Sequence, residues 1–141
     1  MPTQPETRFK RLFDRWFDQL HLRKHHDCSY RTAIEKGQGQ RSGLPDRLYV
    51  HKGHAWVESK VEPYHPSELQ MSTCSRLSKG GSRVLIITRL RESTSMMIDE
   101  FLSDGTIYTH SSVPVEVIRR RPFWCWLLRS RSPHKAGKTP W

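Results

Sequence analysis

Residues 43–60 read GLPDRLYVHKGHAWVESK, and this stretch decides the fold. Two runs rich in β-forming residues, Arg47–His51 and Ala55–Val61, flank the dipeptide Lys52-Gly53, a pattern typical of a β-hairpin with a tight turn. If paired residue numbers sum to 104 or 105, Asp46 lies opposite Glu58 or Ser59. Glu58 and Lys60 are two residues apart on one strand, so their side chains project from the same face.

The hairpin therefore predicts two carboxylates and one ammonium group at its open end. Carboxylates that lie close together repel each other unless a cation lies between them. Oxygen ligands at an open site suit Mg²⁺ or Mn²⁺, and a neighbouring lysine can position or deprotonate a water molecule. This combination indicates metal-assisted hydrolysis of a phosphodiester, with Asp46, Glu58 and Lys60 as the catalytic residues. The alternative is a surface hairpin with an ordinary cross-strand ion pair.

The sequence before the hairpin predicts a helix over residues 6–25 and a short strand over residues 30–34. Apolar residues recur at helical spacing on one face of this helix, namely Phe9, Leu12, Phe13, Trp16, Phe17 and Leu20. We expect Phe9, Phe13, Trp16 and Leu20 to pack on the sheet.

The sequence after the hairpin predicts a helix that begins at Ser67 and ends near Lys79, before Gly80-Gly81. Ser67 and Gln70 have the spacing of a capping box. The run Arg83–Thr88 predicts a buried strand, Ser95–Leu102 a further helix, and residues 106–108 and 113–118 edge strands. The class is α/β, with a mixed sheet flanked by helices and a core in α-β-β-β-α-β order.

Length and composition indicate one domain with a tail. The 141 residues carry a net charge of +10. Residues 111–141 hold seven basic side chains and one acidic one. We therefore divide the chain into a domain of residues 1–118 and a basic tail of residues 119–141 that contains tryptophan. A strong excess of positive charge favours a polyanionic partner such as nucleic acid.

The apolar runs, the N-terminal residues and the cysteines together exclude several classes of protein. The longest apolar runs, residues 84–87 and 123–128, are far shorter than the roughly 20 residues that span a bilayer, so we expect no transmembrane segment. The N-terminus lacks the apolar core of a secretory signal. Three widely spaced cysteines indicate reduced thiols. We expect an intracellular protein, located in the cytoplasm or, for a viral protein, in the host cytoplasm.

The ordered set of motifs resembles the PD-(D/E)XK nucleases, and more closely the VRR-NUC family of stand-alone, virus-type nucleases. The resemblance covers residues 6–102, and the counterparts, in chain order, are Glu6, Gly43-Leu44-Pro45-Asp46, Glu58-Ser59-Lys60, Ser67-Glu68-Leu69-Gln70, Gly80-Gly81 and Arg83–Thr88. Two residues depart from the family pattern, because Arg47 and Ser59 stand where apolar residues are common.

The resemblance implies a restriction-endonuclease-like core and a DNA endonuclease that needs Mg²⁺ or Mn²⁺. Asp46, Glu58 and the backbone carbonyl of Ser59 would bind the metal, and Lys60 would be the catalytic lysine. Gln70 would support the site. Glu6 is carried over as a further metal ligand, with Glu35 as a competing choice. Junctions and flaps are candidate DNA structures, in a DNA-repair or viral setting.

Basic residues outside the hairpin predict contacts with DNA. Arg41 lies in a glycine-rich loop just before Asp46, and Arg119, Arg120 and Arg121 open the basic tail. Cleavage of branched DNA needs two sites, so a symmetric homodimer is expected.

Three other functions stay open at this stage. The same scaffold could bind nucleic acid without cleaving it. A tail with interleaved cations and aromatic rings could also lie on an anionic membrane surface, or be disordered, as such termini most often are. His21, His25, His26 and Cys28 could form a zinc site, although no second group of ligands at suitable spacing completes it.

Overall fold

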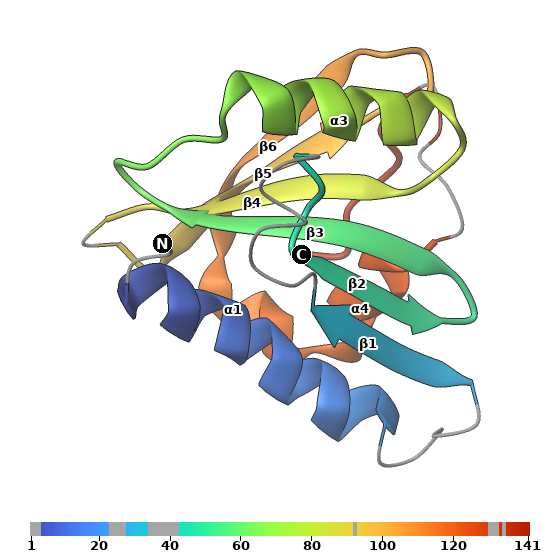
Figure 1. Ribbon diagram of the computed structural model, residues 1–141. Coiled ribbons are helices and arrows are strands. Elements are labelled where there is room, and N and C mark those ends of the chain that lie inside the picture. The colour runs from blue at the N-terminus through green and yellow to red at the C-terminus, as the bar shows by residue number, and fades with distance from the viewer. Residues whose placement is uncertain (1–3, 23–27, 34–42, 92, 130–132, 134) are drawn as a thin grey trace.

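The computed structural model contains a six-stranded sheet with helices on both faces (Figure 1). It describes residues 4–22, 28–33, 43–91, 93–129, 133 and 135–141. The elements in chain order are α1 (Gln4–Phe17), a π-helical turn (Asp18–Leu22), β1 (Ser29–Ala33), β2 (Arg47–His51), β3 (His54–Val61), α3 (Glu68–Lys79), β4 (Val84–Arg89), β5 (Ser95–Phe101), β6 (Ile107–Pro114), a 3₁₀ helix (Val115–Arg119) and α4 (Arg121–Leu127).

The strands follow one another across the sheet in sequence order, from β1 to β6. All neighbouring pairs are antiparallel except β3 and β4, which are parallel. A parallel pair needs a crossover connection, and α3 provides it on one face of the sheet. The expected mixed sheet flanked by helices is therefore confirmed.

The β2–β3 hairpin has the predicted register. Arg47 pairs with Val57 and Val50 with His54, so paired residue numbers sum to 104. Continuing this register by one residue places Asp46 opposite Glu58, which is one of the two partners that the sequence predicts. The capping box at the start of α3 is also confirmed, since the Ser67 side chain accepts from the backbone of Gln70 and the Gln70 side chain accepts from the backbone of Ser67.

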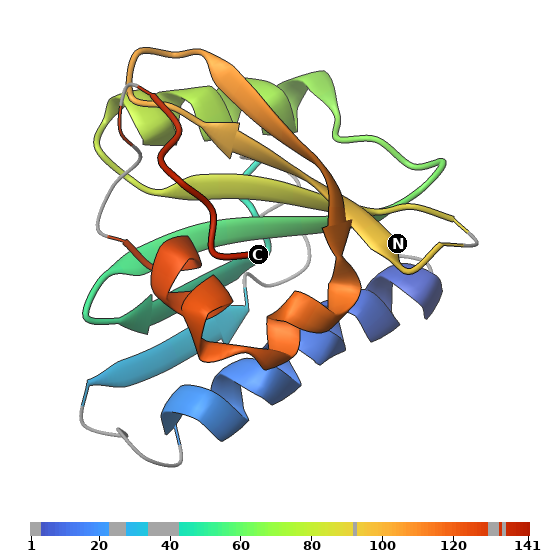
Figure 2. The ribbon, with the colours of Figure 1, turned by 180° about the vertical axis from the view of Figure 1, so that it is seen from behind.

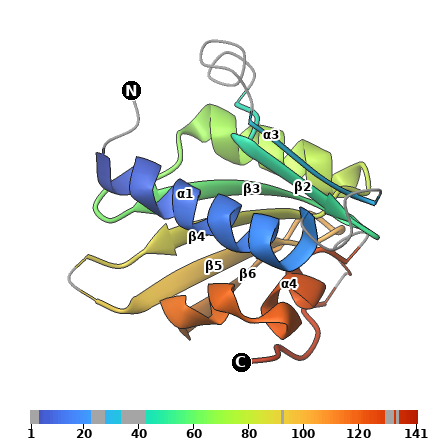
Figure 3. The same ribbon diagram turned by 90° about the horizontal axis from the view of Figure 1, so that it is seen from below.

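Two apolar layers hold the sheet between the helices. The larger one lies between the sheet and α1, the 3₁₀ helix and α4, which share one face (Figures 2 and 3). The smaller one lies under α3 and contains Cys74, Val84, Ile86 and Phe101. Because both faces are covered, β4 is apolar along its length, which explains its uninterrupted run of Val, Leu and Ile.

The predicted packing face of α1 is confirmed. Phe9, Phe13 and Phe17 are buried, and Trp16 and Leu20 are partly buried and pack against the same core. The α-helix ends at Phe17 and continues as a π-helical turn that contains Leu20. Trp16 lies at the border of the interface, where the guanidinium of Arg119 stacks 5.1 Å from the centre of its ring.

The prediction of a helix over Ser95–Leu102 is wrong, because this segment forms strand β5. Met and Glu are good helix formers, but Met96, Ile98 and Glu100 are buried at a spacing of two residues, which is the period of a strand. The backbone pairing with β4 and β6 on both sides outweighs the local propensity. The two predicted edge strands correspond to the single strand β6 followed by the 3₁₀ helix.

The predicted boundary at residue 118 does not separate a tail from the domain. Helix α4 begins three residues later, and Phe123, Trp124, Trp126 and Leu127 on it are buried in the larger core. The indole N–H of Trp124 donates to the carbonyl of Ile118 at 2.7 Å. The segment is rich in Arg and Lys, so its amphipathic pattern was not predicted. The apolar side of α4 closes the core of the domain.

Among the described residues, no helix is both long and apolar enough to cross a membrane.

Candidate active site

The open end of the β2–β3 hairpin holds the predicted constellation of Asp46, Glu58 and Lys60. The ammonium of Lys60 lies 3.8 Å from a carboxylate oxygen of Glu58. The Glu58 carboxylate also accepts a hydrogen bond from the backbone N–H of Asp46. The Glu58 side chain is only 4% exposed, and those of Lys60 and Asp46 are 14% and 21% exposed. The three groups thus share a half-enclosed site that solvent can reach.

Lys10 is a member of this site that the sequence reasoning missed. Its ammonium forms an ion pair with the carboxylate of Asp46, and its residue is buried on α1. Lys10 follows the buried Glu6 by four residues, one turn along the same helix face. The signal was present in the sequence, because Glu6 and Lys10 stand at helical spacing with Phe9 and Phe13. Charged residues in an apolar stripe indicate a buried polar site.

The environment of Glu58 favours its protonated form. Burial raises its pKa, the negative charge of Asp46 raises it further, and Lys10 and Lys60 partly offset this effect. The pKa of Glu58 is consequently about 7. Cys74 on α3 forms part of the cover: burial and then the charge of Glu58 raise the pKa of its thiol to about 12. A further positive charge beside a carboxylate in such surroundings stabilises its ionised form.

Two contacts fix the position of the Asp46 loop. Gly43 has φ +71° and packs against α3, where a Cβ would lie 2.5 Å from the carbonyl oxygen of Leu69. Only glycine fits this combination of a left-handed backbone and a close approach. On the other side, the guanidinium of Arg47 donates to Asp14 on α1 and to the backbone carbonyl of Asp46. Arg47 therefore joins α1 to the loop that carries Asp46.

Gln70 has a structural task at the start of α3. Its side-chain oxygen accepts from the backbone N–H of Ser67 at 2.9 Å, and its own backbone N–H donates to the Ser67 hydroxyl. Its supporting role in the site stays a prediction. Ser59 is buried on β3, between Glu58 and Lys60 in the sequence, and metal binding by its backbone carbonyl stays a prediction.

The donor set fits a small divalent cation. Asp46 and Glu58 supply carboxylate oxygens, and one oxygen of Asp46, Oδ1, is buried without a hydrogen-bond partner among the described residues. An acceptor in that state is poised to bind a cation. No group of three or more acidic, histidine or cysteine side chains suited to a metal occurs in the described part of the chain. The prediction that Glu6 is a further ligand therefore gains no support.

The other predicted site residues are not brought to the hairpin. Arg41 and the competing Glu35 lie outside the described residues, as do His25 and His26 of the zinc alternative. Arg119, Arg120 and Arg121 are exposed around the start of α4. Arg119 stacks on Trp16, six residues beyond Lys10 on α1, and Arg120 pairs with Glu116 at 3.3 Å. A role for these arginines in DNA binding stays a prediction.

Replacing Glu58 by Gln is expected to stabilise the metal-free protein at high pH. The pKa of Glu58 is about 7 in the folded state, above its ordinary value of 4.5. Its favourable contribution is therefore fully present below about pH 4.5 and is lost as the pH rises through about 7. The Gln variant should match the parent protein near pH 5 and exceed it at pH 8 by on the order of 2 kcal/mol, since one pKa unit corresponds to about 1.4 kcal/mol.

Urea denaturation in EDTA at both pH values measures this difference. Glu116→Gln, which changes an exposed carboxylate on the 3₁₀ helix, is the matched control and should show no such pH dependence. An equal effect of Glu58→Gln at pH 5 and pH 8 would show that the pKa of Glu58 is not raised into this range on folding.

Comparison with known proteins gives one structural neighbour of note. The solved structure of Hjc, a Holliday junction resolvase from the archaeal hyperthermophile Archaeoglobus fulgidus, is 13% identical to this chain, with a TM-score of 0.44. The alignment covers 79% of this chain and 98% of that one. No protein-family model matches, and no curated protein matches by sequence. The assignment of chemistry accordingly rests on the geometry of Asp46, Glu58 and Lys60.

Proposed function

We propose that this protein is a metal-dependent DNA endonuclease of the restriction-endonuclease-like type. The observation that carries the proposal is the convergence of Asp46, Glu58 and Lys60 at the end of one hairpin, with a carboxylate oxygen of Asp46 left without a partner in the described structure. Two carboxylates beside a lysine are a combination suited to metal-assisted phosphodiester hydrolysis. The net charge of +10 suits a polyanionic substrate.

Each residue has a distinct task in this proposal. Asp46, Glu58 and the carbonyl of Ser59 would hold Mg²⁺ or Mn²⁺. When bound, the cation would offset charge on the phosphate and lower the pKa of a water molecule. Lys60 would orient or deprotonate the attacking water and offset the negative charge that develops on the phosphate oxygens. Lys10, paired with Asp46, would keep the two carboxylates together in the absence of metal.

The finer assignments extend this proposal. The order of motifs favours the VRR-NUC type, and its departures at Arg47 and Ser59 leave the three central residues in place. We propose branched DNA, such as a junction or flap, as the substrate. We also propose a symmetric homodimer, in which two equivalent sites would act on two strands.

A cleavage assay tests the proposal directly. Labelled linear duplex, flap, splayed-arm and four-way-junction DNA are incubated with the purified protein in Mg²⁺, Mn²⁺ or EDTA. We expect strand cleavage in either metal and none in EDTA, with branched DNA cleaved fastest. Tight binding of all four DNAs without cleavage in either metal would favour the other candidate, a nucleic-acid-binding module built on the same scaffold.

A further inference from the structure

A second surface feature lies at the same end of the sheet as the candidate active site. It is a cleft of about 800 Å³ between the start of α1, the segment that follows β3, and the turn between β4 and β5. Figure 1 shows these three segments meeting at the end of the sheet where α1 begins. The residues that line it are Pro5, Arg8, Val61, Glu62, Pro63, Tyr64, Arg89, Leu90, Arg91, Ser93 and Thr94.

The cleft adjoins the candidate active site through the covalent chain. Its wall on β3 begins at Val61, the residue after Lys60. Its wall on α1 is formed by Pro5 and Arg8. In the sequence these residues lie on either side of Glu6, within two helical turns of Lys10. The cleft therefore begins at the strand residue that follows the candidate catalytic lysine.

The chemistry of the lining suits one strand of a nucleic acid. Of its three arginines, Arg8 comes from α1, and Arg89 and Arg91 come from the end of β4 and the turn that follows it. In the described structure, none of their guanidinium groups forms an ion pair or hydrogen bond with another side chain. An arginine with no protein partner has its donors available for phosphate oxygens. Glu62 contributes the one carboxylate of the lining.

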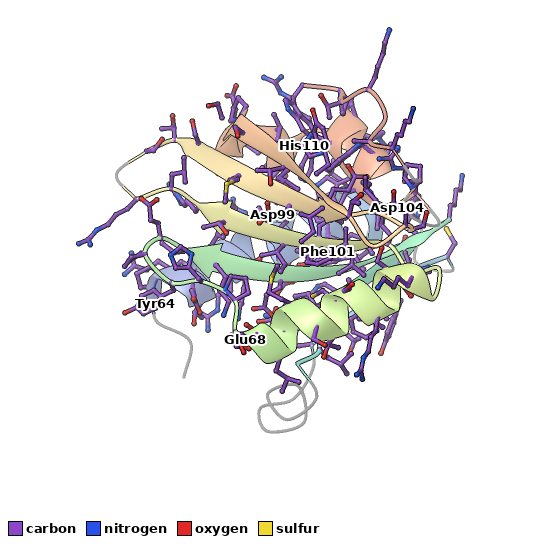
Figure 4. The ribbon with its side chains drawn as sticks, turned by 90° about the horizontal axis from the view of Figure 1, so that it is seen from above. Tyr64, Glu68, Asp99, Phe101, Asp104 and His110 are labelled. Atoms are coloured by element: carbon purple, nitrogen blue, oxygen red, sulfur yellow. The ribbon has the colours of Figure 1, made fainter. Side chains whose placement is uncertain are left out.

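An exposed ring completes the surface. Tyr64 is 52% exposed, on the connection between β3 and α3, and its side chain projects away from the core (Figure 4). Pro5 and Pro63 lie with it in the lining, which thus combines apolar rings with the cations. Cations that follow a phosphate backbone, combined with an aromatic ring that a base can stack on, are typical of single-strand binding.

The walls of the cleft are held in place by backbone contacts. The N–H of Glu62 donates to the carbonyl of Arg89 at 3.0 Å, and the N–H of Arg91 donates to the Glu62 carboxylate at 3.3 Å. Glu62 thus ties the end of β3 to the start of the β4–β5 turn. The arginines on that turn are therefore positioned relative to Lys60, which limits the ordering cost of binding.

We propose that this cleft binds the strand of the DNA substrate that flanks the phosphate at the candidate active site, with Arg8, Arg89 and Arg91 on its phosphates and Tyr64 against a base. This inference rests on the proposed function in one respect, namely that the bound strand leads toward Lys60. The binding of a single strand in the cleft is a separate claim and can be measured without cleavage.

The test is binding of a fluorescein-labelled 12-nucleotide single strand to the full chain in EDTA, followed by anisotropy between 50 and 200 mM salt. Arg8→Ala/Arg89→Ala/Arg91→Ala should weaken binding at least about tenfold and reduce the salt slope of log K by about 2, at roughly 0.7 per phosphate contact on a single strand. Arg76→Ala, on the exposed far end of α3, removes one positive charge away from the cleft and should leave the slope nearly unchanged.

Substitutions of Tyr64 test the stacking contact separately. Tyr64→Ala should weaken binding by about five-fold to more than a hundred-fold, the measured range for loss of one stacked base, whereas Tyr64→Phe should bind like the parent because the ring remains. Circular dichroism and thermal unfolding check that each variant is folded. The same substitutions repeated with the cleavage substrates should raise KM more than they lower kcat.

The outcomes separate this inference from the proposed function. An unchanged salt slope in the triple arginine variant, together with parental affinity in Tyr64→Ala, would overturn the cleft as a strand-binding site whether or not the protein cleaves DNA. Loss of binding in both variants, in a protein that cleaves no DNA structure in Mg²⁺ or Mn²⁺, would support the cleft and overturn the endonuclease.

Discussion

Lys60→Met is expected to abolish DNA cleavage while leaving the fold intact. Lysine and methionine have similar lengths, and the aliphatic stem can stay in the partly buried site beside Glu58. The lost group is the ammonium that would move a proton or offset charge in the transition state, a contribution of typically 10² to 10⁴ in rate. The fall should appear in kcat, with little change in DNA affinity, because the group acts mainly in the reaction itself.

Asp46→Ala provides the companion measurement. This change removes a proposed metal ligand and should eliminate both cleavage and the increase in thermal stability that Mn²⁺ gives the parent protein. Lys60→Met should retain that increase. The matched control is Lys52→Met in the turn of the same hairpin, where the side chain is exposed and far from the carboxylates.

The effects of substitutions at residues that act as a unit are not additive. The double variant Glu58→Ala/Lys60→Ala should therefore cleave DNA scarcely more slowly than either single variant. Cleavage by Lys60→Met at the parental rate would mean that Lys60 belongs to an ordinary ion pair and that the binding-only module is the better description.

Trp124→Ala is expected to destabilise the protein by about 3–5 kcal/mol, the usual cost of removing a large buried aromatic side chain. Trp124 is fully buried, and its ring lies 5.5 Å from that of Phe17 on α1 and 5.3 Å from that of Tyr49 on β2. The change would also remove the hydrogen bond to Ile118. Since small domains are stable by only about 5–15 kcal/mol, a large share of the stability should be lost.

Urea denaturation of the parent and variant measures this loss. Cys125→Ala, at an exposed position on the same helix, should cost little. Deletion of residues 119–141 should unfold the protein, because it removes all of α4. A deletion variant that still unfolds cooperatively, with parental stability, would show that residues 1–118 form a complete domain and that α4 is an accessory.

The candidate site was largely predictable because its residues lie within one local element. Asp46, Glu58 and Lys60 belong to a single hairpin, and the position of its turn at Lys52-Gly53 determines which residues face each other. Lys10 was not predicted as part of the site. Its role depends on how α1 crosses the sheet, and that crossing is set by the packing of Phe9, Phe13 and Phe17 against strands distant in the sequence.

The two errors in the fold have a common physical origin. For Ser95–Phe101 the local preference for a helix is overcome by hydrogen bonds to two neighbouring strands, and those strands come from different parts of the chain. For residues 121–127 the basic composition indicated a solvated tail, although the apolar residues of the segment are numerous enough to cover a core. Whether such residues are buried depends on the presence of an uncovered apolar surface elsewhere.

The sequence by itself determined the hairpin, its register to within one residue, the capped helix α3, the buried strand β4 and the three polar groups that meet at the hairpin's open end. These follow from short-range rules of turn chemistry, side-chain alternation and capping, which operate within a few residues. Only the tertiary structure decided that residues 95–101 pair as a strand, that α4 closes the core, and that Lys10 reaches Asp46. Only the tertiary structure, likewise, placed Arg8, Arg89 and Arg91 around one cleft, because these contacts join segments that the chain separates by tens of residues.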